Sequence, residues 1–111
     1  RTYRPNIRIT SGTATGIIGQ NEIPVSYSLS QNYPNPFNPV TAINYAVPKQ
    51  SLVTLRVYDI LGREVATLVN EVKAQGYHTV DFNASSLGSG VYFYKLESDN
   101  FTDIKKMIVI K

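Results

Sequence analysis

The sequence contains no cysteine, no tryptophan and a single histidine, His78. Without cysteine the chain has no disulfide, no thiolate ligand for zinc and no cysteine nucleophile. Its apolar runs are short, such as residues 107–110, whereas a membrane-spanning helix needs roughly 20 apolar residues. The sequence therefore predicts a fold held together by its apolar core, with no segment inserted in a membrane.

Charge is also sparse, since charged residues make up 17% of the 111 residues and the formal net charge is +3. Residues 1–26 carry three arginines against one glutamate, and residues 27–111 carry eight basic against seven acidic residues. A nucleic-acid-binding domain concentrates positive charge on one face. The nearly neutral body of the chain argues against a nucleic-acid partner.

The composition of the chain changes near residue 27. Residues 10–26 are rich in glycine, threonine and serine and lack sustained periodicity, which predicts a linker. Residues 1–9 contain one short extended candidate, which is either the last strand of a preceding domain or no element at all. Because the chain begins with Arg1, we expect it to be a piece of a longer protein.

Apolar and polar residues alternate with period two in the second half of the chain. In residues 52–58, for example, Val53, Leu55 and Val57 alternate with polar side chains. This pattern predicts a strand with one buried and one solvated face. Further strands are expected at residues 41–47, 63–69, 77–82, 91–96 and 102–111. Short strands about ten residues apart, with no helical stretch, predict an all-β antiparallel sandwich over about residues 27–111.

Two glycines and one aspartate mark the connections between these strands. Gly62 can adopt a positive φ at no steric cost, so residues 59–62 are expected to form a turn. Asp59 is expected to accept hydrogen bonds from backbone N–H groups of that turn. Gly90 is expected to adopt a backbone conformation that is closed to other residues.

Residues 31–39, which we call the strap, contain three prolines within six residues. Each proline fixes φ and removes a backbone donor, so the strap is stiff and cannot join a central strand. Tyr33 and Phe37 are the side chains able to anchor it against a core. The favoured interpretation is a rigid segment that closes one end of the sandwich, and the weaker one is a presented polyproline-like ligand.

Several separated motifs together resemble the C-terminal sorting domain of the type IX secretion system, type A. The resemblance begins at residues 27–45, with YSLSQNYPNPFNP followed by TxIxY, and continues at residues 57–65, VYDILGREV. It extends through GxH at residues 76–78 and LxSGVYxYxL at residues 87–96, and ends in KKM with Lys111. It covers about residues 27–111 and preserves the order and spacing of the motifs.

The resemblance implies an immunoglobulin-like sandwich of seven strands at the C-terminus of a secreted cargo protein in Bacteroidetes-type bacteria. Such domains carry no catalysis. They direct the cargo through the outer-membrane translocon, and are then commonly cut off by processing machinery while the cargo is released or attached to cell-surface lipopolysaccharide. Residues 1–9 would then be the end of the cargo, joined in cis by the linker. We therefore expect a location in the medium or at the cell surface.

We expect the sorting machinery to recognise the strap, the 59–62 turn, the Ser-Gly connection and the C-terminal strand. The candidate residues are Pro34, Asn35, Pro36, Phe37, Asn38, Pro39, Tyr58, Asp59, Gly62, Ser89, Gly90, Tyr92, Lys105, Lys106 and Lys111. For the three lysines a plainer role is open, because lysines beside an apolar strand protect sheets against edge-to-edge aggregation.

No catalytic, cofactor-binding or metal site is predicted. His78 has no second histidine and no GxSxG motif to work with, so we expect a half-exposed strand histidine. The first alternative to a sorting module is a carbohydrate-binding module, in which Tyr92 and Tyr94 stack on sugars; core filling is favoured for both. The second alternative is a surface-assembly module whose copies associate through the strap or the terminal strand.

Overall fold

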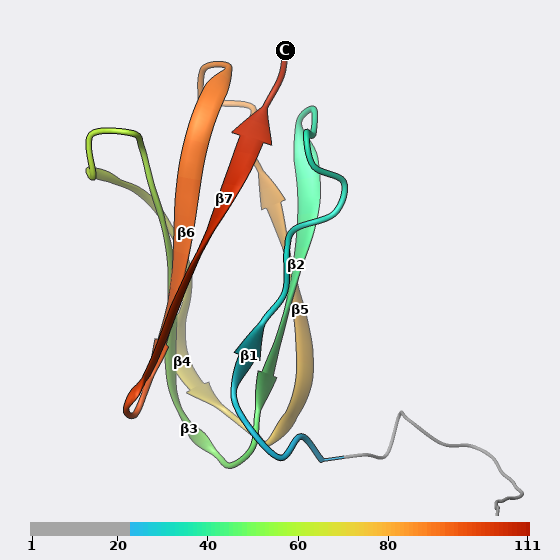
Figure 1. Ribbon diagram of the computed structural model, residues 1–111, viewed down its shortest axis with the longest axis vertical. Helices are drawn as coiled ribbons and strands as arrows, with labels where there is room; N and C mark the ends of the chain where they lie inside the picture. Colours follow the sequence, from blue (N-terminus) through green and yellow to red (C-terminus); the bar gives the residue numbers. More distant parts are fainter. Residues whose placement is uncertain (1–22) are drawn as a thin grey trace, which may run out of the picture.

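The computed structural model describes residues 23–111, which form seven β-strands and no helix. The predicted end of a cargo domain, residues 1–9, and residues 10–22 of the predicted linker lie outside the described residues. The strands form two antiparallel sheets that face each other as layers (Figure 1). The predicted all-β antiparallel sandwich of about seven strands is confirmed.

No helix in the described part of the chain is long and apolar enough to span a bilayer.

The smaller sheet has the strand order β1-β2-β5, and the larger sheet has the order β4-β3-β6-β7. The chain changes sheets between β2 and β3, between β4 and β5, and between β5 and β6. Strand β3 is therefore a central strand of the larger sheet. It lies between β6 and its sequence neighbour β4, which forms the edge of the sheet. The strands are β1 Ser28–Leu29, β2 Val40–Val47, β3 Ser51–Tyr58, β4 Glu64–Lys73, β5 Gly76–Asn83, β6 Gly90–Ser98 and β7 Phe101–Val109.

The core lies between the sheets and is built from the alternating positions of the strands. Val53, Leu55 and Val57 of β3 are completely buried, as the alternation of residues 52–58 predicts. All the remaining strands also contribute side chains to the core, among them Leu29, Ile43, Tyr45, Val47, Val69, Phe82, Tyr94, Leu96, Met107 and Val109. Burial of these apolar side chains supplies the main driving force for folding.

Strand β7 buries only one of its two apolar faces. Met107 and Val109 point into the core and are 0% and 1% exposed, whereas Ile104 and Ile110 are 55% and 49% exposed. Apolar residues occupy the consecutive positions 107–110, so alternation alone does not indicate which face is covered. The structure covers the inner face with the core and leaves apolar side chains on the outer face.

Two elements differ from the sequence prediction. Strand β1 was not predicted, because its two residues have no period of their own and are held by pairing with Tyr45 and Ala46 of β2. Strand β4 continues four residues beyond the predicted end at Val69. Its last residues are mostly polar, but they pair with the first residues of β3, so tertiary pairing extends the strand.

The strap connects the two sheets. Tyr33 exchanges backbone hydrogen bonds with Ala42 of β2, each with an N···O distance of 3.0 Å. Phe37 donates its N–H to the carbonyl of Ile108 and accepts from the N–H of Ile110, both at 3.0 Å. Asn35 Oδ1 accepts the N–H of Ile108 at 2.9 Å. The strap therefore covers backbone groups on the free edge of β7, which would otherwise be open to another strand.

The hydroxyl group of Tyr94 attaches the segment that leads into the strap to the core. Tyr94 is 0% exposed, and its hydroxyl donates to the carbonyl of Ser30 at 2.7 Å and accepts from the N–H of Asn32 at 2.8 Å. Burial raises the pKa of Tyr94 to about 12, so the hydroxyl stays protonated at physiological pH. Asn32, itself 2% exposed, donates to the carbonyl of Pro34 and to Thr41 Oγ1. One buried polar network thus holds the start of the strap.

Only one of the two predicted anchors of the strap enters the core. Phe37 is 1% exposed and packs edge-on against Phe82, with ring centroids 6.2 Å apart. Tyr33 is 81% exposed, so its prediction as an anchor is wrong. Tyr33 lies opposite Ala42, which alternates with buried neighbours and faces outward, and residues that face each other across paired strands share a face.

The Tyr94→Phe substitution is expected to lower the free energy of unfolding by about 1–3 kcal/mol, because it leaves the buried N–H of Asn32 without a partner and removes the donor to the part-buried carbonyl of Ser30. Tyr92→Phe is the matched control, because the Tyr92 hydroxyl donates to Gly88 at an exposed position, where water can replace it. Urea unfolding of both variants measures the two losses. Equal losses would contradict the role assigned to the Tyr94 hydroxyl.

Candidate recognition site

The 59–62 turn is closed by the side chain of Asp59. Its Oδ1 accepts the N–H groups of Leu61 and Arg63, each at 2.9 Å, and its backbone carbonyl accepts the N–H of Gly62 at 2.9 Å. Gly62 has a φ of 85°, in the left-handed region that favours glycine. The predicted roles of Asp59 and Gly62 in this turn are therefore confirmed.

The carboxylate of Asp59 also forms an ion pair with Arg63, with 2.8 Å between Oδ2 and Nε. Hydrogen bonds from the Arg63 and Leu61 N–H groups, with the Arg63 guanidinium, lower the pKa of Asp59. The ionised form is thus the one that the turn stabilises. The turn consequently presents Ile60 and Leu61, 72% and 73% exposed, in a defined loop.

Two surface hollows lie beside this turn. The first, which we call the turn hollow, has a volume of about 500 Å³ and is lined by Tyr58, Asp59, Ile60, Gly62, Phe93, Lys95 and Ile104. The second has a volume of about 340 Å³ and is lined by Asp59, Ile60, Leu61, Arg63, Ser89, Gly90, Val91 and Tyr92. Six candidates from two distant motifs, Tyr58, Asp59, Gly62, Ser89, Gly90 and Tyr92, thus gather around one turn.

The sequence reasoning missed three apolar residues of this site. Ile60, Phe93 and Ile104 line the turn hollow, yet none belongs to the predicted set. Phe93 and Ile104 occupy positions on the outer face of β6 and β7, where alternation predicts solvent. An apolar residue at an outward position was the signal that could have indicated them.

The remaining candidates lie at the strap and at β7, outside the two hollows. Pro34, Asn35, Pro36 and Asn38 are exposed, Pro39 is half-buried and Phe37 is in the core. The candidates on β7 and beyond differ among themselves. Lys106 is exposed and lies opposite Phe93, whereas Lys105 is half-buried and lies opposite Tyr94.

Lys111 is held by the connection between β5 and β6. Its Nζ donates to the carbonyl groups of Ala84 at 3.1 Å and Ser85 at 3.0 Å. Gly90, at the end of the same connection, has a φ of 151°. The expectation of an unusual backbone conformation at Gly90 is confirmed.

Tyr92 and Tyr94 of β6 fill the core rather than forming an exposed stripe. Tyr94 is completely buried, and Tyr92 is half-buried and packs against the core. The interpretation of both as core material is confirmed. Tyr94 is not accessible to a sugar ring, so this pair does not form the stacking platform that the carbohydrate-binding alternative needs.

His78 is half-exposed on β5, as predicted. Its ring stacks on Tyr45 with centroids 5.3 Å apart, and its Nε2 lies 2.8 Å from the carbonyl oxygen of Ala74. Within residues 23–111, no three His, Asp or Glu side chains gather in a way that could hold a metal ion. The side chain of His78 thus packs against Tyr45 on the neighbouring strand β2 and hydrogen-bonds to the connection between β4 and β5.

The candidate residues and the strap lie on a domain that a family model matches. The model, described as a secretion system C-terminal sorting domain, matches residues 31–111. The chain belongs to this family. It is the sorting-domain family of type IX secretion, so the resemblance seen in the sequence is confirmed. No curated protein and no solved structure matches the chain.

Membership of the family determines the general role of this sorting domain. A type IX sorting domain is a C-terminal sorting signal and marks proteins that are exported to the cell surface or the medium. The family is generally non-catalytic, and its role implies contact with secretion machinery and a cargo in cis.

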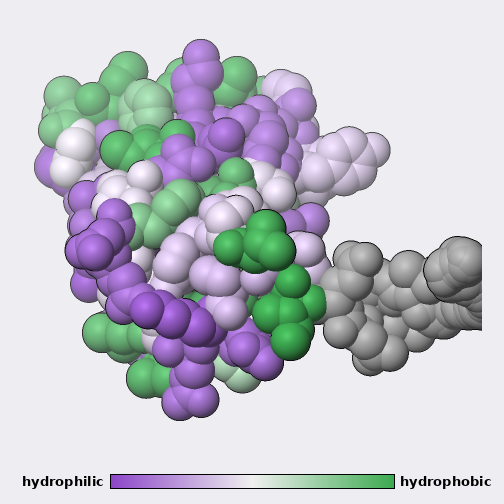
Figure 2. All heavy atoms as spheres, turned by 60° about the horizontal axis from the view of Figure 1, so that its bottom comes forward, coloured by the Kyte–Doolittle hydropathy of each residue, from purple (hydrophilic) through white to green (hydrophobic). Residues whose placement is uncertain are grey.

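The sorting domain has two different ends. Figure 1 shows the β3–β4 turn and the C-terminus at one end, and the entry of residues 23–27 at the other. Figure 2 shows the entry end from outside, where hydrophilic groups are interspersed with separate hydrophobic ones. The chain that joins the linker thus enters the sandwich far from the 59–62 turn.

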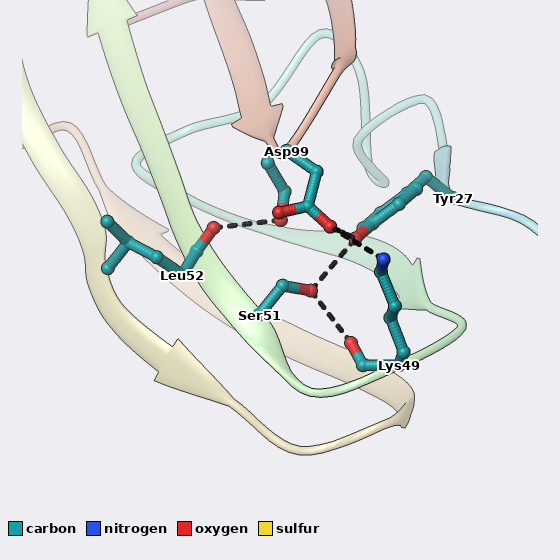
Figure 3. A network of polar contacts seen from close by, with 6 residues as sticks. Tyr27, Lys49, Ser51, Leu52 and Asp99 are labelled. Atoms are coloured by element: carbon teal, nitrogen blue, oxygen red, sulfur yellow. Dashed lines mark hydrogen bonds and ion pairs between the residues drawn. The ribbon is translucent and has the colours of Figure 1, made fainter.

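Tyr27 fastens the chain at the entry end (Figure 3). Its hydroxyl donates to Asp99 Oδ2 at 2.8 Å and lies 2.9 Å from Ser51 Oγ, and its ring stacks on Phe101 with centroids 5.4 Å apart. Lys49 Nζ lies 3.4 Å from the same oxygen of Asp99. The turns β2–β3 and β6–β7 are thereby joined to the entering chain through one side chain.

We expect the pH-dependent order of the 59–62 turn to follow the ionisation of Asp59. Because the folded pKa is lowered, the stabilisation is complete above the ordinary carboxyl pKa and is lost as pH falls through the folded value. The amide signals of Leu61 and Arg63 in an NMR titration should therefore change below the ordinary Asp pKa. At pH 7, Asp59→Ala should speed hydrogen exchange at both amides, and Asp59→Asn should do so less. A midpoint at or above the ordinary value would contradict this assignment.

Tyr27→Phe is expected to raise the pKa of Asp99 towards its ordinary value, because the hydrogen bond from Tyr27 is the largest cause of its lowering. The stack on Phe101 remains in this variant. Lys49→Met is a comparison variant, because Lys49 lowers the same pKa through a hydrogen bond and through its charge, each a smaller contribution than the Tyr27 hydrogen bond. Titration of the Asp99 carboxyl carbon by NMR measures both. An unchanged Asp99 pKa in the Tyr27 variant would overturn this account of the entry end.

Proposed function

We propose that this chain is a non-catalytic module that directs a cargo protein across the outer membrane to the cell surface or the medium. The cargo is joined in cis through residues 10–26, and residues 27–111 form the recognised domain. The observation that supports this most strongly is the meeting of distant family motifs around the 59–62 turn. The pairing of β3 with β6 brings these motifs, about 30 residues apart in the sequence, onto one exposed surface that a partner can reach.

The sorting partner, in this proposal, binds preformed structure. The Asp59 carboxylate closes the turn through two backbone N–H groups, and the Tyr94 hydroxyl fixes the segment before the strap. Neither surface needs to be ordered on binding, which lowers the entropic cost of recognition. The proposed contacts are the strap, the turn with its hollows, and β7 with Lys105, Lys106 and Lys111.

The arrangement of the two ends of the sandwich suits this role. Residues 23–27 enter at the end opposite the 59–62 turn (Figure 1), and Tyr27 holds them there. A cargo attached through the linker is thus directed away from the turn hollow. The proposed translocon and sorting machinery can therefore approach the turn while the cargo remains attached.

Deletion of residues 27–111 from the parent protein is expected to abolish its export, and deletion of residues 104–111 should do the same because it removes most of β7. Export is measured as the fraction of cargo in the medium and on intact cells of a type IX-secreting bacterium. Leu52→Lys, at an exposed position of β3 outside the strap, the two hollows and β7, serves as the control and should leave export unchanged. Unchanged export after either deletion would refute the proposed function.

A further inference from the structure

The turn hollow lies on the outer face of the larger sheet, the side away from the core. Tyr58 on β3 lies opposite Phe93 on β6, and Ile104 on β7 lies opposite Lys95 on β6. These positions alternate with the buried core residues of the same strands, so the core does not need them. Three neighbouring strands nevertheless place an aromatic or aliphatic side chain here, and the exposed Ile60 adds a fourth. The outer face thus holds an apolar cluster that no described element covers.

Two ammonium groups flank this apolar cluster. The Nζ of Lys95 lies 5.5 Å from the centroid of the Tyr58 ring. Lys106 lies directly opposite Phe93 on the same face, is exposed, and forms no ion pair within residues 23–111. The hollow therefore has an apolar floor and a positively charged border.

The carboxylates on this face do not cancel the positive charge beside the turn hollow. Glu64 and Glu97 both pair with Arg56, at 3.6 Å and 3.7 Å, and Lys95 Nζ is 3.9 Å from Glu97. These four groups carry no net charge together, and Asp59, which lines the hollow, is paired with Arg63 at 2.8 Å. Lys106 thus remains as an excess positive charge beside the apolar floor.

We propose that the turn hollow binds a peptide segment of the sorting partner that carries an apolar side chain next to carboxylates. The apolar side chain fills the space between Tyr58, Phe93 and Ile104, and the carboxylates meet Lys95 and Lys106. A buried apolar anchor within a charged border is the usual arrangement of a binding hot spot, and the opposite charges favour the correct partner. This inference rests on the proposed function and names the chemistry of its partner.

A second copy of the chain fits the hollow less well. Among residues 23–111, Ile60 and Leu61 at the turn are the one pair of adjacent exposed large apolar side chains that a second copy could insert. The nearest carboxylate is that of Asp59, which is already occupied by its own backbone N–H groups and by Arg63. It cannot meet Lys106 without opening the turn that presents Ile60.

A defined peptide tests the proposed chemistry on the 111-residue chain. The probe is a capped eight-residue peptide with one phenylalanine between two aspartates and serine elsewhere, and the control peptide has lysine in place of both aspartates. We expect the aspartate peptide to shift the NMR signals of Tyr58, Phe93 and Ile104, and the lysine peptide to leave them unchanged at the same concentration. Equal shifts with both peptides, or shifts confined to another face, would overturn the proposal.

Two matched substitutions link the hollow to export. Ile104 and Leu52 are 55% and 56% exposed on the outer face of the same sheet, but only Ile104 lines the hollow. Ile104→Lys should abolish peptide binding and lower export at least tenfold, whereas Leu52→Lys should leave both unchanged. Circular dichroism verifies that both variants are folded. Equal behaviour of the two folded variants would contradict a role for the hollow.

Charge reversal at Lys106, export of the Ile104 variant and light scattering together distinguish the possible outcomes. Lys106→Glu should weaken binding of the aspartate peptide at least threefold and strengthen binding of the lysine peptide. If Ile104→Lys exports normally while deletion of residues 27–111 abolishes export, the hollow is refuted and the sorting function stands. If light scattering shows concentration-dependent dimers that Ile104→Lys abolishes, the occupant is a second copy and the proposal is overturned.

Discussion

The hydroxyl of Tyr94 is the contact on which the strap side of this sandwich depends. It lies inside an apolar core and satisfies one backbone donor and one backbone acceptor of the segment that leads into the strap. In low dielectric surroundings such a bond is strong, and its loss is costly. Because this segment is fixed, Phe37 reaches the core and the edge of β7 is covered. The Tyr94 hydroxyl thus holds the proline-rich strap against the sandwich.

The sandwich places the entry of the chain and the proposed recognition turn at opposite ends. Tyr27 fastens the entering chain to the β2–β3 and β6–β7 turns, while the turn closed by Asp59 lies at the other end (Figure 1). At each end one side chain satisfies several polar groups, since Tyr27 contacts residues of two turns and Asp59 accepts two N–H groups of its own turn. The domain can therefore stay small and free of disulfides and still hold two surfaces at a fixed separation. In the proposed function, this separation keeps the 59–62 turn away from the point where the cargo is attached.

Much of the fold was predictable because strand alternation is a local property. The alternation at Val53, Leu55 and Val57 predicted a strand with one buried face, and that face is the core. Tyr33 was predicted wrongly because its direction is decided by its partner Ala42, which only strand pairing reveals. At the site, Asp59 and Gly62 were predictable from turn chemistry. Phe93 and Ile104 were not, since their meeting depends on the register between β3, β6 and β7.

The sequence by itself determined the class of fold, the turn residues and the family, because period-two alternation, glycine positions and motif spacing are all written along the chain. Tertiary structure alone decided which surfaces exist. The order β4-β3-β6-β7 places Tyr58 beside Phe93 although about 35 residues lie between them, and parallel pairing sets the strap against β7. Such contacts arise from packing between sheets and strands, whose geometry depends on all the core side chains together.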